Sequence, residues 1–163
     1  MFFCTFLSCF FAFMFCAHYS GRREKDTGKL YSLVAFESMW ELGIWVYVRT
    51  IHCNNITRVS SGYEATGLSL AKEITGKQFG NKGGVGVSLS WCDVPLCFMN
   101  CHLAARPTRV KQRETDYCQI TDKLRLEQDL PDSGLDVLHQ HDHVFWLGDL
   151  NYRVRTRGLR SLL

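Results

Sequence analysis

The segment HDHVFWLGDLNYR, residues 141–153, runs an apolar stretch directly into Asp149, Asn151, Tyr152 and Arg153. If the chain stays extended, Asp149 and Asn151 aim at one point, which would place a base or water-positioning carboxylate beside a neutral amide donor for phosphate. Arg153 would add a guanidinium fork suited to phosphate oxygens. The alternative is an Asx turn that closes a strand, and this is the safer interpretation of GDLN taken alone.

Two further motifs place polar groups beside apolar strands. The glycines of GNKGGVG, residues 80–86, let the backbone approach a ligand or a neighbouring loop closely, and Lys82 offers a positive charge. Taken alone, this segment is more often a tight turn. The segment NCHLAAR brings His102 to the end of a predicted strand.

Positive side chains follow His102 at the start of a predicted helix, where they oppose the helix dipole unless an anion lies near. They are Arg106, Arg109, Lys111 and Arg113. The alternative is a solvated face of snorkelling arginines, which is the safer interpretation of any single one.

The histidine-rich segment HQHDHV, residues 139–144, suggests a metal because alternate histidines on a strand face the same side. No cysteine or carboxylate is placed to complete a zinc shell without long-range folding. Metal binding is therefore the minor interpretation of this segment.

Short strands separated by turn residues must position these motifs. In residues 85–91 the large apolar side chains alternate with glycine and serine, which predicts a half-buried strand. The pattern changes to helical spacing from Pro107 to about Leu126. The other predicted strands are residues 31–36, 43–50, 55–61, 96–103 and 144–149, with 96–103 as the antiparallel partner of 85–91. This order predicts an α+β fold, a mixed sheet or sandwich covered by helices.

Composition bounds the class of protein. The 163 residues suit one domain, and 46% hydrophobic with 21% charged residues is enough material for a packed core. The formal net charge of +3 indicates no DNA-coating surface. The eight cysteines are unevenly arranged and favour free thiols of a reducing compartment over a disulfide framework.

The first nineteen residues carry no Lys, Arg, Asp or Glu. As a helix they would be about 28 Å long, barely enough for a bilayer core of about 30 Å. The following GRREK would then stay on the cytosolic side. A start that is not native to the domain is the equal alternative. We divide the chain into an apolar segment (1–20), a polar hinge (21–30) and the domain itself (31–163).

Together and in this order, FGNKGGVGVSL, FMNCHLAAR and VFWLGDLNYR resemble the inositol polyphosphate 5-phosphatase catalytic domain, over residues 31 to 153. The resemblance implies a partial DNase-I-like β-sandwich flanked by helices, of the endonuclease/exonuclease/phosphatase superfamily, preceded here by an apolar N-terminal helix. It also implies magnesium-dependent hydrolysis of the 5-phosphate of phosphoinositide lipids or soluble inositol polyphosphates.

The resemblance assigns roles residue by residue. Asp149 would activate the attacking water, Asn151 would hold the scissile phosphate and His102 would donate to its oxygens. The expected substrate-binding residues are Lys82, Asn81, Arg106, Tyr152 and Arg153. The metal-binding Glu and the closing Asp-His pair of that family have no counterpart in this sequence, so no metal ligand is assigned.

These implications predict a phosphoric monoester hydrolase at the cytosolic face of a membrane, with a possible N-terminal transmembrane anchor and no nucleic-acid partner. For the chain as written we expect no measurable turnover, because a site that acts as a unit loses orders of magnitude when members are missing. The alternatives are a nuclease of the same superfamily and a non-catalytic, membrane-associated fragment that binds phosphoinositides.

Overall fold

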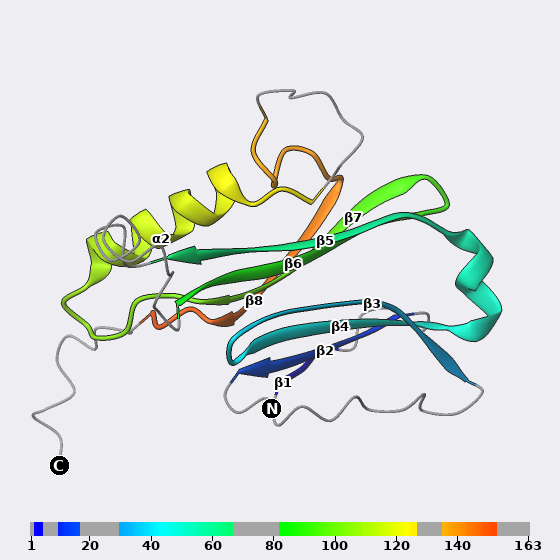
Figure 1. Cartoon of the computed structure of the whole chain (residues 1–163), viewed down its shortest axis with the longest axis horizontal. Coiled ribbons are helices and arrows are strands. Elements are labelled where there is room, and N and C mark those ends of the chain that lie inside the picture. The colour runs from blue at the N-terminus through cyan, green and yellow to red at the C-terminus, as the bar shows by residue number, and fades with distance from the viewer. Residues whose placement is uncertain (1, 5–9, 17–29, 67–81, 127–134, 153–163) are drawn as a thin grey trace, which may run out of the picture.

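The computed structural model describes residues 2–4, 10–16, 30–66, 82–126 and 135–152. These residues form two four-stranded sheets that lie face to face, with the helix α2 on the outside of one of them (Figure 1). The strand orders are β1-β2-β4-β3 in the first sheet and β5-β6-β7-β8 in the second.

The first sheet is antiparallel throughout. Its strands are β1 (Phe2–Cys4), β2 (Phe10–Cys16), β3 (Tyr31–Met39) and β4 (Leu42–Arg49). A 3-10 helix, η1 (Thr50–Asn55), leads into the second sheet. There β5, β6 and β7 pair antiparallel and β8 runs parallel to β7. The bounds are β5 (Ile56–Thr66), β6 (Lys82–Trp91), β7 (Val94–His102), α2 (Val110–Lys123) and β8 (His143–Asp149).

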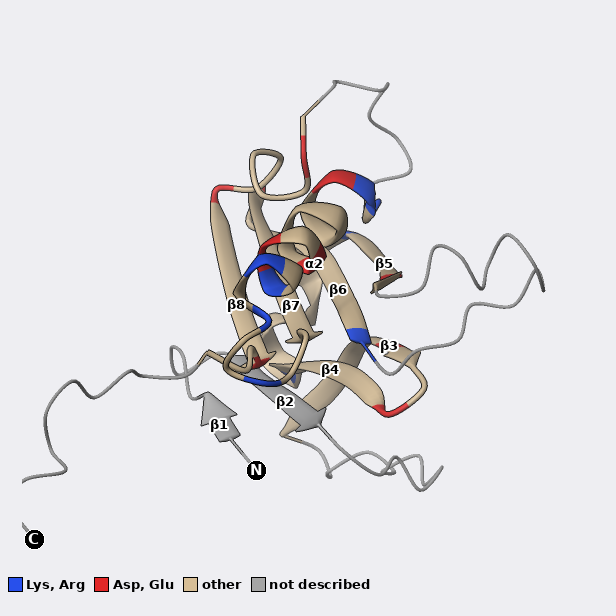
Figure 2. Cartoon of the chain, turned by 90° about the vertical axis from the view of Figure 1, so that its left-hand side faces the viewer, with Lys and Arg blue, Asp and Glu red and all other residues tan. Residues whose placement is uncertain are grey.

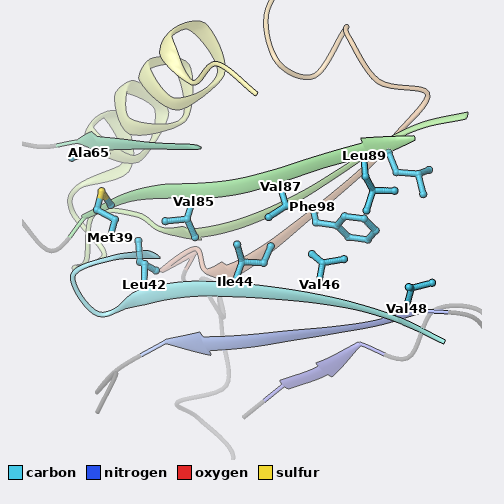
Figure 3. Packing of buried hydrophobic residues seen from close by; sticks show 11 residues of the cluster. Met39, Leu42, Ile44, Val46, Val48, Ala65, Val85, Val87, Leu89 and Phe98 are labelled. Atoms are coloured by element: carbon cyan, nitrogen blue, oxygen red, sulfur yellow. The ribbon is translucent and has the colours of Figure 1, made fainter. Parts of the chain in front are cut away.

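The main core lies between the two sheets (Figure 3). Alternate side chains of β4 point into it, since every second residue of a strand faces the same side. These side chains meet those of β6 and β7. The contributors drawn in Figure 3 include Ile44, Val46, Val48, Val85, Val87, Leu89 and Phe98. The packing of the two sheets confirms the predicted sandwich.

A second core lies between the other face of β6 and β7 and the helix α2. Gly84 and Gly86 permit this packing, because a Cβ at Gly84 would lie 3.0 Å from Ile120 and one at Gly86 would lie 3.1 Å from Leu126. The prediction of a half-buried strand is therefore wrong for β6, which is buried on both faces. The small side chains that looked solvent-facing in the sequence instead make room for the helix and the segment after it.

The predicted apolar N-terminal helix is also wrong where the chain is described. Residues Phe10–Cys16 form β2, which pairs with β4 from Phe10 opposite Val48 to Cys16 opposite Leu42. Aromatic residues favour strands, and β4 offers a free edge on which this segment completes its backbone hydrogen bonds. No helix in the described part of the chain is long and apolar enough to span a bilayer. The division of the chain at residues 20 and 30 stays a prediction.

The helix α2 begins at Val110, three residues after the predicted start. Pro107 lies in a turn instead, because Arg106 has a positive φ of 82° and its carbonyl accepts a hydrogen bond from the Arg109 amide. The predicted free thiols are confirmed for the five cysteines whose side chains the structure describes. These are Cys53, Cys92, Cys97, Cys101 and Cys118.

Candidate active site

Three neighbouring strands bring the predicted site residues to one end of the second sheet. β6 begins there, while β7 and β8 end there, and Figure 2 looks onto this end of the molecule. Gly83 lies opposite His102 across β6 and β7, and His102 lies opposite Asp149 across β7 and β8. The register therefore places the start of β6 beside His102 and Asp149, although Lys82 and Asp149 are 67 positions apart in the sequence.

Lys82, His102 and Asp149 form the centre of this cluster. Lys82 Nζ is hydrogen-bonded to His102 Nε2. The same His102 nitrogen lies 3.7 Å from Asp149 Oδ2. The His102 side chain is 17% exposed and that of Asp149 is 51% exposed, so the carboxylate faces solvent beside a largely buried imidazole. A cation, an imidazole and a half-exposed carboxylate thus meet at this end of the sheet.

Gly148 brings Asp149 to this position. Its φ is +125°, and a Cβ there would lie 2.0 Å from the carbonyl oxygen of Cys101 on β7. Only glycine fits such a conformation and such a close approach of two backbones. The glycine of the GDLN motif therefore lets β8 end tightly against β7, which sets Asp149 beside His102.

The chain does not stay extended from Asp149 to Asn151, which was the condition for the two side chains to aim at one point. The Asn151 amide donates to Asp149 Oδ1 at 3.1 Å, and Asn151 has a φ of 53°. This is the Asx turn named as the alternative, and asparagine tolerates its left-handed conformation. The Asn151 side chain is 8% exposed and its Nδ2 donates to the Leu103 carbonyl at 3.0 Å. Asn151 thus ties the end of β8 to the end of β7.

The helix α2 holds the segment that follows His102. Arg113 Nη1 donates to the carbonyls of Ala104 (3.2 Å) and Arg106 (2.8 Å), and Asp116 Oδ2 accepts the Ala104 amide at 2.9 Å. Arg113 and Asp116 are 2% and 1% exposed. Arg113 is therefore not the snorkelling arginine that the sequence suggested.

The positioning role of Arg113 and Asp116 was not predicted from the sequence. The available signal was their separation of three residues, which places both on one face of a helix together with the apolar Ile120. Charged residues on the buried stripe of a helix need partners, and here the partners are the backbone of the segment after His102 and, for Asp116, the Gln112 side chain as well.

The other predicted substrate-binding residues have different positions. Arg106 is exposed at the turn before α2. Tyr152 is 62% exposed, with the Arg113 guanidinium carbon 5.5 Å from the centre of its ring. Asn81 and Arg153 lie outside the described residues. The structure thus gathers Lys82, His102 and Asp149 and leaves the roles of all these residues as predictions.

The histidine-rich segment does not converge on one point. His139 Nδ1 lies 2.7 Å from Asp136 Oδ1, and His141 Nδ1 is 2.8 Å from the Val137 carbonyl oxygen. His143 begins β8, at the end of the strand far from Asp149. Burial raises the pKa of Asp136, but hydrogen bonds from the His139 side chain and from nearby amides outweigh this and hold the pKa below its usual value.

The described residues do not by themselves fit a magnesium site. Mg²⁺ takes oxygen ligands in octahedral geometry, and in the described ranges no three His, Cys, Asp or Glu side chains are grouped to hold a metal. Asp149 contributes a single carboxylate. Glu37 is engaged elsewhere, because its two oxygens accept the Ser38 amide (3.0 Å) and the Ser61 hydroxyl (2.8 Å).

Comparisons with known proteins agree with the fold and the motifs. The model of endonuclease/exonuclease/phosphatase family 2 matches residues 14–161. Phosphatidylinositol 3,4,5-trisphosphate 5-phosphatase 2B of Danio rerio is 36% identical over 146 residues, 89% of this chain and 11% of the relative. Phosphatidylinositol 3,4,5-trisphosphate 5-phosphatase 2 of Mus musculus is 35% identical over 76% of this chain and 9% of its own length.

A solved structure has the same fold. It is the inositol polyphosphate 5-phosphatase domain of SPsynaptojanin in complex with inositol (1,4)-bisphosphate and calcium ion, with a TM-score of 0.62, 29% identity, and coverage of 76% of this chain and 32% of that one. The chain spans about a tenth of the length of its curated relatives. With the matched family model covering nearly all of its residues, this chain belongs to endonuclease/exonuclease/phosphatase family 2.

Proposed function

We propose that this chain forms part of an inositol polyphosphate 5-phosphatase domain, which hydrolyses the 5-phosphate of phosphoinositides or soluble inositol polyphosphates. The observation that carries the proposal is the meeting of Lys82, His102 and Asp149 at three adjacent strand ends. The relatives named above as phosphatidylinositol 3,4,5-trisphosphate 5-phosphatases support the substrate class. The proposed reaction takes place at the cytosolic face of a membrane or on soluble inositol phosphates.

The chemistry of phosphate ester hydrolysis suits this arrangement. Negative charge spreads over the phosphoryl oxygens in the transition state, so fixed positive donors supply most of the stabilisation. Lys82 provides an ammonium group at the site. Asp149 provides a half-exposed carboxylate that can accept a proton from the attacking water. Asn151 and Arg113 would act by holding the ends of β7 and β8 in place.

A divalent metal, for which we propose Mg²⁺, would complete the site in the whole domain. The solved neighbour was crystallised with calcium. When bound, such an ion would neutralise charge on the phosphate. Because the described residues of this chain do not gather a ligand set, the roles given above to Lys82, His102 and Asp149 are stated without it.

The test uses the longest natural translation product that contains this chain. With Mg²⁺ it is expected to convert short-chain phosphatidylinositol 3,4,5-trisphosphate to the 3,4-bisphosphate, identified by chromatography of the headgroups. Asp149→Asn should lower kcat by at least about 100-fold, the usual contribution of a general base. Asp142→Asn is the matched control, because Asp142 is an exposed aspartate just before the other end of β8.

Each alternative has its own outcome. Cleavage of DNA or RNA without release of inorganic phosphate would select the nuclease. Saturable binding of phosphoinositide vesicles without turnover would select the non-catalytic binding protein. Full activity of Asp149→Asn would overturn the role proposed for Asp149.

A further inference from the structure

The contact between Lys82 and His102 fixes which ring nitrogen of His102 carries the proton. Lys82 Nζ is hydrogen-bonded to His102 Nε2. A lysine ammonium has three donors and no acceptor. The shared hydrogen therefore belongs to Lys82, and Nε2 contributes a lone pair. A neutral imidazole with a bare Nε2 carries its hydrogen on Nδ1.

Asp149 would favour the opposite tautomer. Its Oδ2 lies 3.7 Å from His102 Nε2, just beyond hydrogen-bond distance. An ionised carboxylate only accepts hydrogen bonds, so without a competing donor it would draw the imidazole hydrogen to Nε2. Lys82 and Asp149 thus compete for one nitrogen, and Lys82 has the closer contact.

We propose that Lys82 is a positioning residue that selects the Nδ1–H tautomer of His102 in the site before substrate binds. The inference deepens the proposed phosphatase function and rests on it only for its catalytic consequence. That consequence changes the role expected for His102. In this state the ammonium of Lys82, and not the imidazole Nε2, offers N–H groups to an arriving phosphate on this side of the ring, while His102 holds the ammonium in place.

The start of β6 is built to deliver Lys82 to this contact. Gly83 lies opposite His102. Its φ is +151°, and a Cβ there would lie 2.3 Å from the Glu64 carbonyl oxygen and 2.6 Å from Met39 Cε. The backbone at Gly83 therefore lies so close to β5 and to the hairpin of β3 and β4 that only glycine fits there, and this places the preceding Lys82 beside His102. His102 is 17% exposed, and partial burial strengthens a charge-assisted hydrogen bond.

The experiment records long-range ¹H–¹⁵N correlations of the histidine rings in the ¹⁵N-labelled chain, at a pH above the ordinary imidazole pKa of about 6.5. Wild-type His102 should show a protonated Nδ1 and a bare Nε2. Lys82→Met should move the ring towards Nε2–H, because the ammonium then no longer donates to Nε2 and the Asp149 carboxylate lies 3.7 Å from it. Lys82→Arg should keep Nδ1–H, since a guanidinium is also donor-only.

His143 serves as the internal control, because it is exposed at the other end of β8 and its ring signals should be the same in every variant. A wild-type His102 with Nε2–H would overturn the proposal, and so would an unchanged tautomer in a folded Lys82→Met. If Lys82→Met does not fold, the tautomers of the wild type and of Lys82→Arg test the proposal. Both should be Nδ1–H, and Nε2–H in either would overturn it.

The tautomer can be measured without turnover, so the two proposals fail separately. Absence of phosphate release by the natural product would overturn the phosphatase and leave the Lys82 contact standing. An Nε2–H tautomer of His102 in an active enzyme would overturn the role proposed for Lys82 and leave the phosphatase function standing.

Discussion

Asn100, buried in β7, donates its Nδ2 to the carbonyl oxygen of Gly43 in β4 at 2.9 Å. This hydrogen bond joins the two sheets two residues before His102. It crosses the apolar core, where a backbone carbonyl has no access to water. Besides the apolar packing, this asparagine therefore ties the hairpin of β3 and β4 to the strand that carries His102.

Replacement of this asparagine should weaken the sandwich. Asn100→Leu removes the donor to Gly43 and leaves a buried carbonyl without that partner, which costs about 1–3 kcal/mol. Urea denaturation followed by tryptophan fluorescence measures the change in the free energy of unfolding. Asn54→Ala, at an exposed asparagine in η1, is the matched control. Equal stability of the two variants would show that the inter-sheet hydrogen bond contributes little.

Arg113 should be needed for the segment that follows His102. In Arg113→Met the carbonyls of Ala104 and Arg106 lose a charged donor, for an expected loss of about 1.5–3 kcal/mol. Hydrogen exchange of the Ala104 amide, which donates to Asp116, should accelerate more than exchange in β6. Arg109→Met changes an exposed arginine one turn earlier and should leave both measurements unaltered.

Gly148→Ala should disturb the site through the backbone. A Cβ at this position meets the Cys101 carbonyl at 2.0 Å, and the φ of +125° is unfavourable for alanine. We expect a loss of at least about 1–3 kcal/mol, the usual cost of a residue held in a sparsely populated conformation. His143→Ala, at the exposed start of the same strand, should have little effect on the denaturation midpoint. A midpoint unchanged in Gly148→Ala would contradict the close approach of β7 and β8.

The cysteines should divide into reactive and protected groups. Burial raises the pKa of the Cys97 thiol to about 12, and burial together with the neighbouring Cys97 raises that of Cys101. At pH 8 iodoacetamide should therefore alkylate the exposed Cys92 and Cys118 and spare the buried pair, as measured by mass spectrometry of peptides. In denaturant all four should react at similar rates.

The same shifts predict a loss of stability in alkali. A thiol whose pKa is raised on folding favours the folded state fully below its unfolded value, 9.0 for Cys97, and this contribution is lost as the pH rises towards about 12. The urea concentration at the midpoint of denaturation should therefore decrease as the pH rises from 9.0 towards about 12. Cys97→Ala should reduce the slope of that decline, and an unchanged slope would place the titrating group elsewhere.

The sequence by itself determined the elements and the site motifs. A short apolar run between turn residues is enough to identify a strand such as β8, because the run is too short for a helix. The polar residues at its end had to be either functional or hydrogen-bonded to their own turn, since unpaired polar groups are costly when buried. The structure shows Asp149 and Asn151 hydrogen-bonded to each other in the Asx turn. Their role in function stays a prediction.

Tertiary structure alone decided which residues meet. Whether the first apolar residues pair with β4, whether Gly84 and Gly86 face solvent or α2, and whether Arg113 is exposed or buried all depend on elements distant in the chain. Local patterns carry no information on such long-range contacts. The hydrogen bond between Lys82 and His102 is the sharpest case, because it exists only where β6 begins beside the end of β7.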